Sequence, residues 1–170
     1  MNKSIFLTAF LAIILLLTSC SNTTPPMPKL DGTEPVPHIS LPTPNGDTLS
    51  VDSFHGKVVF INFWGTYCPP CVAELPELQQ LYDELRDDDL VIIGLNAEEK
   101  PEKVKTFIEK NHITFPIIIS DDATINAIFG LKHMPTTWFV DRKGILRGKI
   151  EGQISKNMAR KIANQLLNEP

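Results

Sequence analysis

The sequence has no run of basic residues, no internal repeats and only three cysteines. Its 16 Lys and Arg residues are outnumbered by 20 Asp and Glu residues, and the formal net charge at pH 7 is -4. Nucleic-acid binders usually present clustered positive charge, so this composition argues against that class. With 170 residues and 42% hydrophobic content, the chain is expected to form one ordinary globular domain.

The four histidines form no recognisable set of metal ligands. His38, His55, His112 and His133 are scattered along the chain, without the close spacing to one another or to cysteine that a zinc site normally uses. We therefore expect neither a bound metal nor another cofactor.

The apolar run at residues 5–17 is too short for a comfortable membrane span. Its thirteen residues would reach only about 20 Å as a helix, against roughly 30 Å for the hydrocarbon core of a bilayer. The charged Lys3 before it and the small Thr18 and Ser19 after it are typical of a secretory signal. We predict that residues 1–19 are a signal peptide.

The residues Leu17-Thr18-Ser19-Cys20 resemble the lipobox of bacterial lipoproteins, in which the cysteine is lipidated and becomes the first residue after cleavage. The resemblance implies an extracytoplasmic protein that is anchored to a membrane through Cys20, and two or more acyl chains would make the attachment stable. The alternative is a stray thiol in an oxidising compartment. Residues 20–37, rich in Ser, Thr and Pro, are expected to be an extended tether, and residues 38–170 the folded domain.

A run of strand-forming residues leads directly into the other two cysteines. The stretch VVFINFWGTYCPPC, residues 58–71, begins with apolar residues that suit a strand covered on both faces. Gly65 ends that run, and Pro69 can occupy the first turn of a helix, where its missing N–H costs nothing. The pattern predicts a buried strand, a short loop and a helix with Cys68 and Cys71 at its start.

The rest of the chain alternates between strand and helix patterns. Further strands are expected at residues 38–41, 48–51, 90–96, 114–119, 136–140 and 145–150, and further helices at 98–111, 121–129 and 155–168. This order predicts an α/β domain with a mixed sheet, in which the last two strands form an antiparallel hairpin.

The spacing of Cys68 and Cys71 suits thiol–disulfide exchange, which needs an attacking thiolate and a second thiol close enough to resolve the mixed disulfide. The dipole and free N–H groups of a helix start favour the thiolate. At pH 7 a thiol with a pKa of about 8.5 is roughly 3% ionised, whereas one with a pKa of about 7 is roughly half ionised. We predict that Cys68 is the nucleophile and Cys71 the resolving thiol; the alternative is a structural or zinc-bound pair.

The stretch FWGTYCPPC, followed by Pro76 and much later by residues 134–137 (MPTT), resembles the dithiol site and the cis-proline loop of the thioredoxin fold. The hairpin before the first core strand and the added helix–strand unit at residues 96–121 resemble the membrane-tethered thiol-disulfide oxidoreductases of the TlpA/ResA/DsbE-like group. The resemblance implies a thioredoxin-like domain, with helices on either side of a mixed central sheet.

The resemblance also implies roles for residues around the dithiol. The matching proline in thioredoxin-like proteins is cis, so Pro135 is expected to be cis and Met134 to contact substrate through its backbone. Trp64 and Tyr67 are expected to serve partly as packing and partly as substrate surface. The matching proline of thioredoxins kinks the first helix, and Pro76 is expected to do the same.

Glu74 is a candidate proton acceptor. It lies three residues after Cys71 and therefore shares a helix face with it. The matching glutamate of the ResA-like group assists proton transfers, whereas thioredoxins proper use an aspartate on the preceding strand. The residue at that strand position here is Asn62, which cannot act as a base. A surface glutamate without a catalytic role is the alternative; if Glu74 is buried, its pKa should be raised.

The function implied by the resemblance is exchange of disulfides with proteins outside the cytoplasm. The group mostly reduces disulfides in specific partners, including apocytochrome c, and draws electrons from a membrane reductant transporter. We expect a monomer that follows this pattern. Oxidising relatives share the fold, and the direction stays open because the reduction potential depends on thiolate stabilisation in three dimensions.

Three other functions need a test. A thiol peroxidase would carry threonine three residues before its peroxidatic cysteine, where Gly65 stands. A copper chaperone of the Sco type would have three residues between its cysteines and a histidine ligand, whereas only two residues separate Cys68 from Cys71. A binding module with an inert dithiol is the third possibility.

Overall fold

The computed structural model describes residues 26–169, which form a six-stranded mixed sheet with a two-stranded hairpin beside it. The strands are β1 (Glu34–Pro35), β2 (Ser40–Pro42), β3 (Thr48–Ser50), β4 (Val58–Trp64), β5 (Leu90–Ala97), β6 (Ile117–Ser120), β7 (Thr136–Val140) and β8 (Ile145–Glu151). The helices are α2 (Pro69–Leu85), α3 (Pro101–Lys110), α4 (Asp122–Phe129) and α5 (Lys156–Leu167), with 3-10 turns η1 (Val51–Phe54) and η2 (Arg86–Asp88). This order confirms the predicted α/β class.

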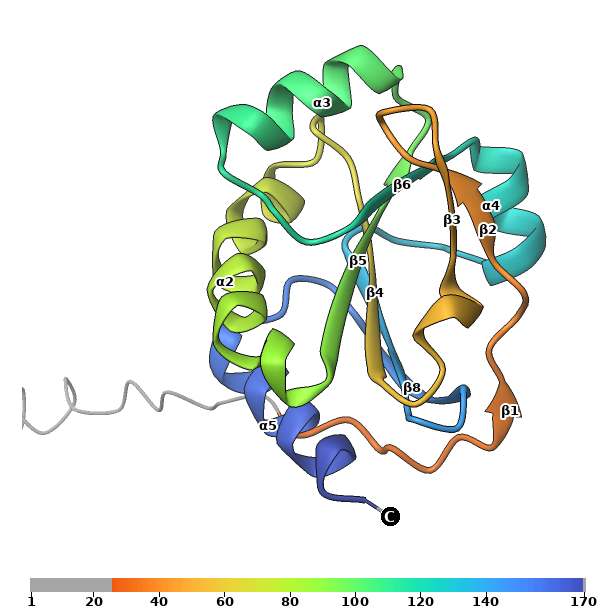
Figure 1. Cartoon of the computed structure of the whole chain (residues 1–170), viewed down its shortest axis with the longest axis vertical. Helices are drawn as coiled ribbons and strands as arrows, with labels where there is room; N and C mark the ends of the chain where they lie inside the picture. The colour runs from red at the N-terminus through yellow and green to blue at the C-terminus, as the bar shows by residue number, and fades with distance from the viewer. Residues whose placement is uncertain (1–25, 170) are drawn as a thin grey trace, which may run out of the picture.

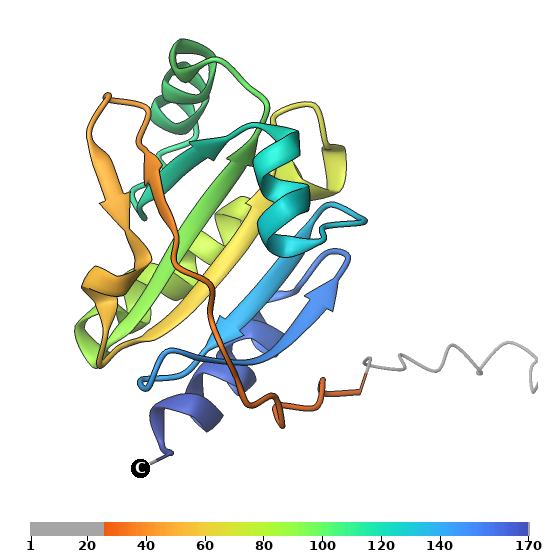
Figure 2. The same cartoon turned by 90° about the vertical axis from the view of Figure 1, so that its right-hand side faces the viewer.

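The strand order in the sheet is β1-β8-β7-β4-β5-β6. Strands β4, β5 and β6 are parallel to one another, and β7 runs antiparallel to both β4 and β8. The central strand β4 therefore has a neighbour on each side, which suits its seven buried residues. Strands β2 and β3 pair as the expected antiparallel hairpin (Figure 2).

Alternate residues of β4 face two different hydrophobic clusters. Val58, Phe60 and Trp64 pack with residues of α2, α3 and α5 on one face, whereas Val59, Ile61 and Phe63 pack with α4 and the hairpin on the other. Figure 1 shows α2 and α5 on one side of the sheet and α4 with β2 and β3 on the other. Because side chains alternate along a strand, the same strand supports both layers.

Two element boundaries differ from the prediction for local reasons. Helix α3 begins at Pro101 rather than at Glu98, because Glu98 has a φ of 61°, in the left-handed region that ends regular structure. Strand β6 begins at Ile117 rather than at Thr114, directly after Pro116, because a proline has no N–H to donate to a sheet. Pro76 lies inside α2, which continues past it to Leu85.

The end of the expected tether is packed on the sheet. Strand β1 pairs with β8, and Leu30 is buried in the same hydrophobic cluster as α2 and α5. The chain passes so close to β8 that an added Cβ on Gly32 would lie 2.2 Å from the carbonyl oxygen of Leu146. The added Cβ of Gly148 would likewise lie 2.6 Å from that of Lys29. The fold thus makes contacts before the expected boundary at residue 38.

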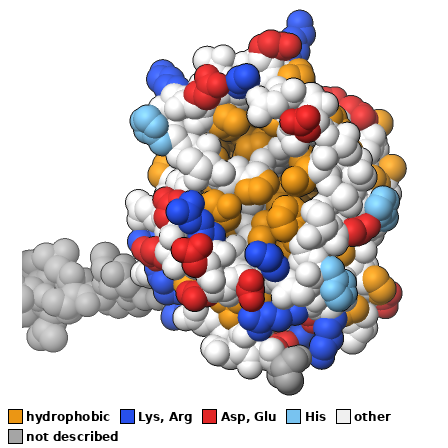
Figure 3. Space-filling view, viewed as in Figure 1, with side chains coloured by type: hydrophobic (Ala, Val, Ile, Leu, Met, Phe, Trp, Pro, Cys, Tyr) orange, Lys and Arg blue, Asp and Glu red, His pale blue; other side chains and the backbone are white. Residues whose placement is uncertain are grey.

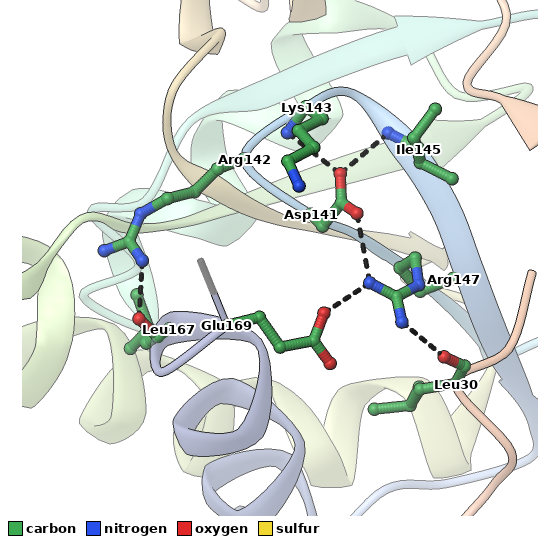
Figure 4. Close-up of polar contacts among 8 residues, drawn as sticks. All are labelled: Leu30, Asp141, Arg142, Lys143, Ile145, Arg147, Leu167 and Glu169. Carbon is green, nitrogen blue, oxygen red and sulfur yellow. Dashed lines mark hydrogen bonds and ion pairs between the residues drawn. The ribbon is translucent and has the colours of Figure 1, made fainter. Parts of the chain in front are cut away.

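Arg147 on β8 fastens this segment to the rest of the fold (Figure 4). Its Nη2 donates to the carbonyl oxygen of Leu30 at 2.8 Å, and its Nη1 donates to Asp141 Oδ2 at 3.1 Å and to Glu169. The backbone of Gly32 donates to the carbonyl oxygen of Arg147 at 3.0 Å. One guanidinium therefore links the N-terminal segment, the β7–β8 turn and the end of the chain.

On the face shown in Figure 3, hydrophobic side chains gather near the middle, and charged side chains of both signs lie around them.

Among residues 26–169, no helix is long and apolar enough to cross a membrane. The predicted signal peptide and the predicted lipidation site at Cys20 lie outside the described residues.

Candidate functional site

The two cysteines lie at the junction between the end of β4 and the start of α2, as predicted. Cys68 is the N-cap residue of α2, and Pro69 occupies the first turn. The backbone N–H of Cys68 donates to the carbonyl oxygen of Gly65 at 3.1 Å, which closes the loop after β4. Cys68 and Cys71 are joined by a disulfide, and their Cα atoms are 5.3 Å apart.

The two sulfurs differ in their environment. Cys68 retains 9% of its surface, whereas Cys71 retains none. The Sγ atom of Cys68 accepts a hydrogen bond from the backbone N–H of Cys71 at 3.3 Å, which would favour a negative charge on that sulfur after reduction. The arrangement can present one stabilised, reachable thiolate and keep the second thiol behind it.

A cis peptide bond between Met134 and Pro135 precedes β7, in agreement with the expectation from the resemblance. Strand β7 pairs with β4, and Thr136 lies opposite Phe63 near the end of β4 that leads to the dithiol. The side chain of Met134 packs against the hydrophobic cluster that contains both cysteines. The cis-proline loop and the dithiol therefore belong to one region of the molecule.

Glu74 is fully buried on α2, with one hydrogen-bond donor at each carboxyl oxygen. Asn62 Nδ2 donates to Glu74 Oε1 at 2.7 Å, and the backbone N–H of Ile154 donates to Oε2 at 2.8 Å. Asn62 Nδ2 also donates to Thr137 Oγ1 at 3.0 Å. Asn62 on β4 thus supplies an amide that supports the carboxyl group of Glu74 on the next helix.

Burial raises the pKa of Glu74 to about 7, because removal from water penalises the charged carboxylate. The hydrogen bonds from Ile154 and Asn62 act in the opposite direction but do not offset the burial. A carboxyl group with this pKa can both accept and release a proton near neutral pH, as general acid–base catalysis requires.

The two aromatic residues before the dithiol have different positions. Trp64 has no exposed surface, and its ring lies 5.3 Å from that of Phe107 in the core. Its predicted share in a substrate surface is therefore corrected to packing alone. Tyr67 is 54% exposed, and its ring covers Gly65, where an added Cβ would lie 2.7 Å from the ring. Tyr67 remains available for contact with a substrate.

The structure adds Glu99, which the sequence analysis did not identify, to the surroundings of the site. Its carboxylate accepts hydrogen bonds from both the backbone N–H and the hydroxyl of Thr66, in the loop before Cys68. Asn96 donates to it at 2.8 Å, and Lys103 forms an ion pair with it at 2.6 Å. Burial alone would raise the pKa of Glu99, but these donors outweigh it and lower the pKa below its usual value.

A signal for Glu99 exists in the sequence. Strands β4 and β5 are parallel, and Trp64 lies opposite Asn96 where both strands end. Polar residues that directly follow two neighbouring parallel strands meet at the same edge of a sheet. Thr66 and Glu99 each lie two residues beyond the end of their strand, close enough to meet at that edge. Within residues 26–169, no cluster of three or more His, Cys, Asp or Glu side chains is arranged to hold a metal ion.

Comparisons with known proteins agree with the geometry. The sequence model of the AhpC/TSA family matches residues 33–149. The thiol-disulfide oxidoreductase ResA of Halalkalibacterium halodurans is 36% identical over 99 residues, which are 58% of this chain and 56% of that protein. The ResA protein of Bacillus thuringiensis is 31% identical over 128 residues, which are 75% of this chain and 74% of that protein.

A solved structure shows the same fold. The thiol:disulfide interchange protein of the thioredoxin family from Chlorobium tepidum superposes with a TM-score of 0.74 at 28% identity. The match covers 80% of this chain and 97% of that chain. It confirms the predicted thioredoxin-like fold, and the ResA relatives confirm the predicted resemblance.

Proposed function

The chain belongs to the AhpC/TSA family and is a thiol-disulfide oxidoreductase of the ResA/DsbE type, and from this we propose that it reduces disulfide bonds in proteins outside the cytoplasm. The observation that carries the proposal is the arrangement of three groups at the N-cap and in the first turns of α2. A reachable sulfur at Cys68 is followed by a buried sulfur at Cys71 and a buried carboxyl group at Glu74.

The first step is an attack on the substrate. With the dithiol reduced, the Cys68 thiolate attacks one sulfur of the substrate disulfide. A bond forms between Cys68 Sγ and that sulfur, and the other substrate sulfur leaves as a thiolate that takes a proton from water. The start of α2 favours the attacking thiolate through its N–H groups and dipole. Tyr67 and the backbone of Met134 are proposed to hold the substrate chain.

The second step releases the substrate. Cys71 loses its proton to the carboxylate of Glu74, and its thiolate attacks Cys68 Sγ. The bond between the enzyme and the substrate breaks, and the Cys68–Cys71 disulfide forms. The second substrate sulfur leaves as a thiolate that takes a proton from water, and Glu74 then releases its own proton to water. One substrate disulfide has then become two thiols, and the enzyme dithiol has been oxidised. A proton acceptor with a pKa of about 7 suits this transfer at neutral pH.

The cellular setting is part of the same proposal. A lipid on Cys20 would hold the enzyme at a membrane surface, and a membrane reductant transporter would return two electrons to the dithiol. Apocytochrome c before haem attachment is the proposed type of substrate, by analogy with the TlpA/ResA/DsbE-like group. The protein is proposed to act as a monomer.

A trapping experiment tests the proposed reaction. The reduced protein is mixed with a peptide that contains one internal disulfide, and the products are alkylated and weighed by mass spectrometry. We expect the wild type to release two peptide thiols per dithiol oxidised. Cys71→Ser should accumulate a mixed disulfide through Cys68, and Cys68→Ser should accumulate none. A peptide that stays oxidised with the reduced wild type would contradict the proposal.

A further inference from the structure

The loop between β8 and α5, residues 152–155, contacts two separate parts of the site through its backbone. The N–H of Gly152 donates to the carbonyl oxygen of Pro135 at 2.8 Å. Two residues later, the N–H of Ile154 donates to Glu74 Oε2 at 2.8 Å. A single short loop therefore holds both the cis-proline and the buried carboxyl group, which come from distant parts of the sequence.

The geometry of this loop depends on glycine. Gly152 has a φ of 102°, which residues with a side chain rarely adopt, and no atom lies within 4 Å of an added Cβ. The position thus requires glycine for its backbone conformation and not for space. The side chain of Ile154 is 1% exposed and belongs to the cluster that contains both cysteines. The backbone conformation of Gly152 and the packing of Ile154 therefore fix the loop at both of its contacts with the site.

Few charged groups act on Glu74, so the hydrogen bond from the loop has a large share in setting its pKa. Apart from the cysteines, the charge that acts on Glu74 is that of Glu77 on the same helix, which raises its pKa. From α5, the Nζ of Lys156 is directed instead to Gln80 at 2.9 Å and Glu84 at 3.4 Å. From β4 and β7, the neighbouring groups are the neutral side chains of Asn62 and Thr137.

We propose that residues 152–155 are a positioning element of thiol–disulfide exchange, which couples the substrate-contacting proline loop to the proton-accepting carboxyl group. The inference rests on the proposed function. A substrate that hydrogen-bonds to the backbone at Met134 displaces Pro135. The hydrogen bond from Gly152 to the carbonyl oxygen of Pro135 transmits this displacement to the loop. The loop then moves the N–H of Ile154 that donates to Glu74. Proton transfer at Glu74 then responds to the presence of substrate. Gly152 and Ile154 act through other groups and do not touch the reacting sulfurs.

The direction of the effect follows from the hydrogen bond at Ile154. That N–H stabilises the charged carboxylate, so a longer or broken bond raises the pKa of Glu74. Disturbance of the loop should therefore move the pH dependence of exchange to higher pH. It should also weaken substrate binding, because the carbonyl of Pro135 loses its donor.

Gly152→Ala tests the proposal, with Gly56→Ala as a matched control. Gly56 has a φ of 90°, has no atom within 4 Å of an added Cβ, and donates through its backbone to Arg142 at 3.0 Å. It precedes β4, at the end of that strand opposite to the dithiol. Both variants place a side chain on a residue with positive φ, but only Gly152→Ala does so beside the dithiol site.

The expected results separate positioning from general destabilisation. Gly152→Ala should shift the pH profile of peptide-disulfide reduction to higher pH and raise KM by about fivefold, the loss expected for one backbone hydrogen bond. Gly56→Ala should lower stability to a similar degree and leave the profile and KM unchanged. If Gly152→Ala changes stability alone, as Gly56→Ala does, the proposal is overturned.

A measurement on the wild type keeps the test independent of variant folding and of turnover. In the oxidised protein, the amide resonance of Ile154 should titrate with Glu74, and a bound substrate-like peptide should change its midpoint pH. A midpoint that stays the same with peptide bound would overturn the coupling. Failure of the wild type to reduce any peptide would instead refute the proposed function, so the two failures are distinguishable.

Discussion

Replacing Glu74 with glutamine should remove a large pH-dependent component from the stability of the oxidised protein. The pKa of Glu74 rises from 4.5 to about 7 on folding, so the folded protein holds this proton more tightly than the unfolded chain does. Each pKa unit corresponds to about 1.4 kcal/mol, and the protonated form therefore contributes about 3 kcal/mol to the free energy of unfolding. That contribution is fully present below pH 4.5 and is lost as the pH rises through about 7.

The structure indicates that glutamine can be accommodated. The side-chain oxygen of glutamine can accept from the N–H of Ile154, as Glu74 Oε2 does. Its amide group then needs an acceptor in place of the donor Asn62 Nδ2. Asn62 Oδ1 is buried and has no partner, so rotation of the Asn62 amide by half a turn supplies one. Glu74→Gln should thus resemble the wild type with a protonated Glu74.

Urea unfolding of the oxidised proteins between pH 4.5 and 8 measures this effect. The wild type should lose about 3 kcal/mol more than Glu74→Gln across that range. Glu102→Gln, at an exposed position on α3, serves as the control and should follow the wild type. If the wild type and Glu74→Gln give parallel stability profiles, Glu74 does not titrate in this range, and its assignment as the proton acceptor loses its basis.

Three further predictions concern the supports of the site and of the N-terminal segment. Glu99→Ala leaves the N–H of Thr66 without its acceptor, and displacement of the loop should slow exchange by about tenfold or more in a peptide-reduction assay. Arg147→Ala removes the donor to Leu30, Asp141 and Glu169. It should lower the free energy of unfolding by about 1–3 kcal/mol, as measured in urea. It should also expose the N-terminal segment to proteases. Gly32→Ala should release the same segment, because its Cβ would lie 2.2 Å from the carbonyl oxygen of Leu146, and should leave the rate of disulfide exchange unchanged. If either variant resists proteolysis as the wild type does, these contacts do not hold the N-terminal segment on the fold.

The sequence predicted the central unit of the fold because its signals are local. The apolar run of β4, the break at Gly65 and the helical spacing after Pro69 all lie within one short stretch, and the structure follows them closely. The cis bond before Pro135 was expected from the resemblance alone, since trans is by far the commoner form for proline in folded proteins.

Contacts between distant residues could not be predicted in the same way. The pairing of β1 with β8 and the hydrogen bond between Arg147 and Leu30 join positions at opposite ends of the chain, and neither has a local sequence pattern. The burial of Trp64 follows from the helix α3 that covers its ring, which the sequence of β4 does not reveal. The same holds for the donor at Ile154, because a backbone N–H leaves no mark in a sequence.

The midpoint potential of the Cys68–Cys71 couple tests the central claim of a reductase most directly. The protein is equilibrated with a series of dithiol–disulfide buffers, and the oxidised fraction is measured by alkylation of the free thiols. We predict a value near that of thioredoxin, about -270 mV, at which the dithiol gives up electrons readily to a substrate disulfide. A value near that of DsbA, about -120 mV, would contradict the claim and assign the protein to the oxidising relatives.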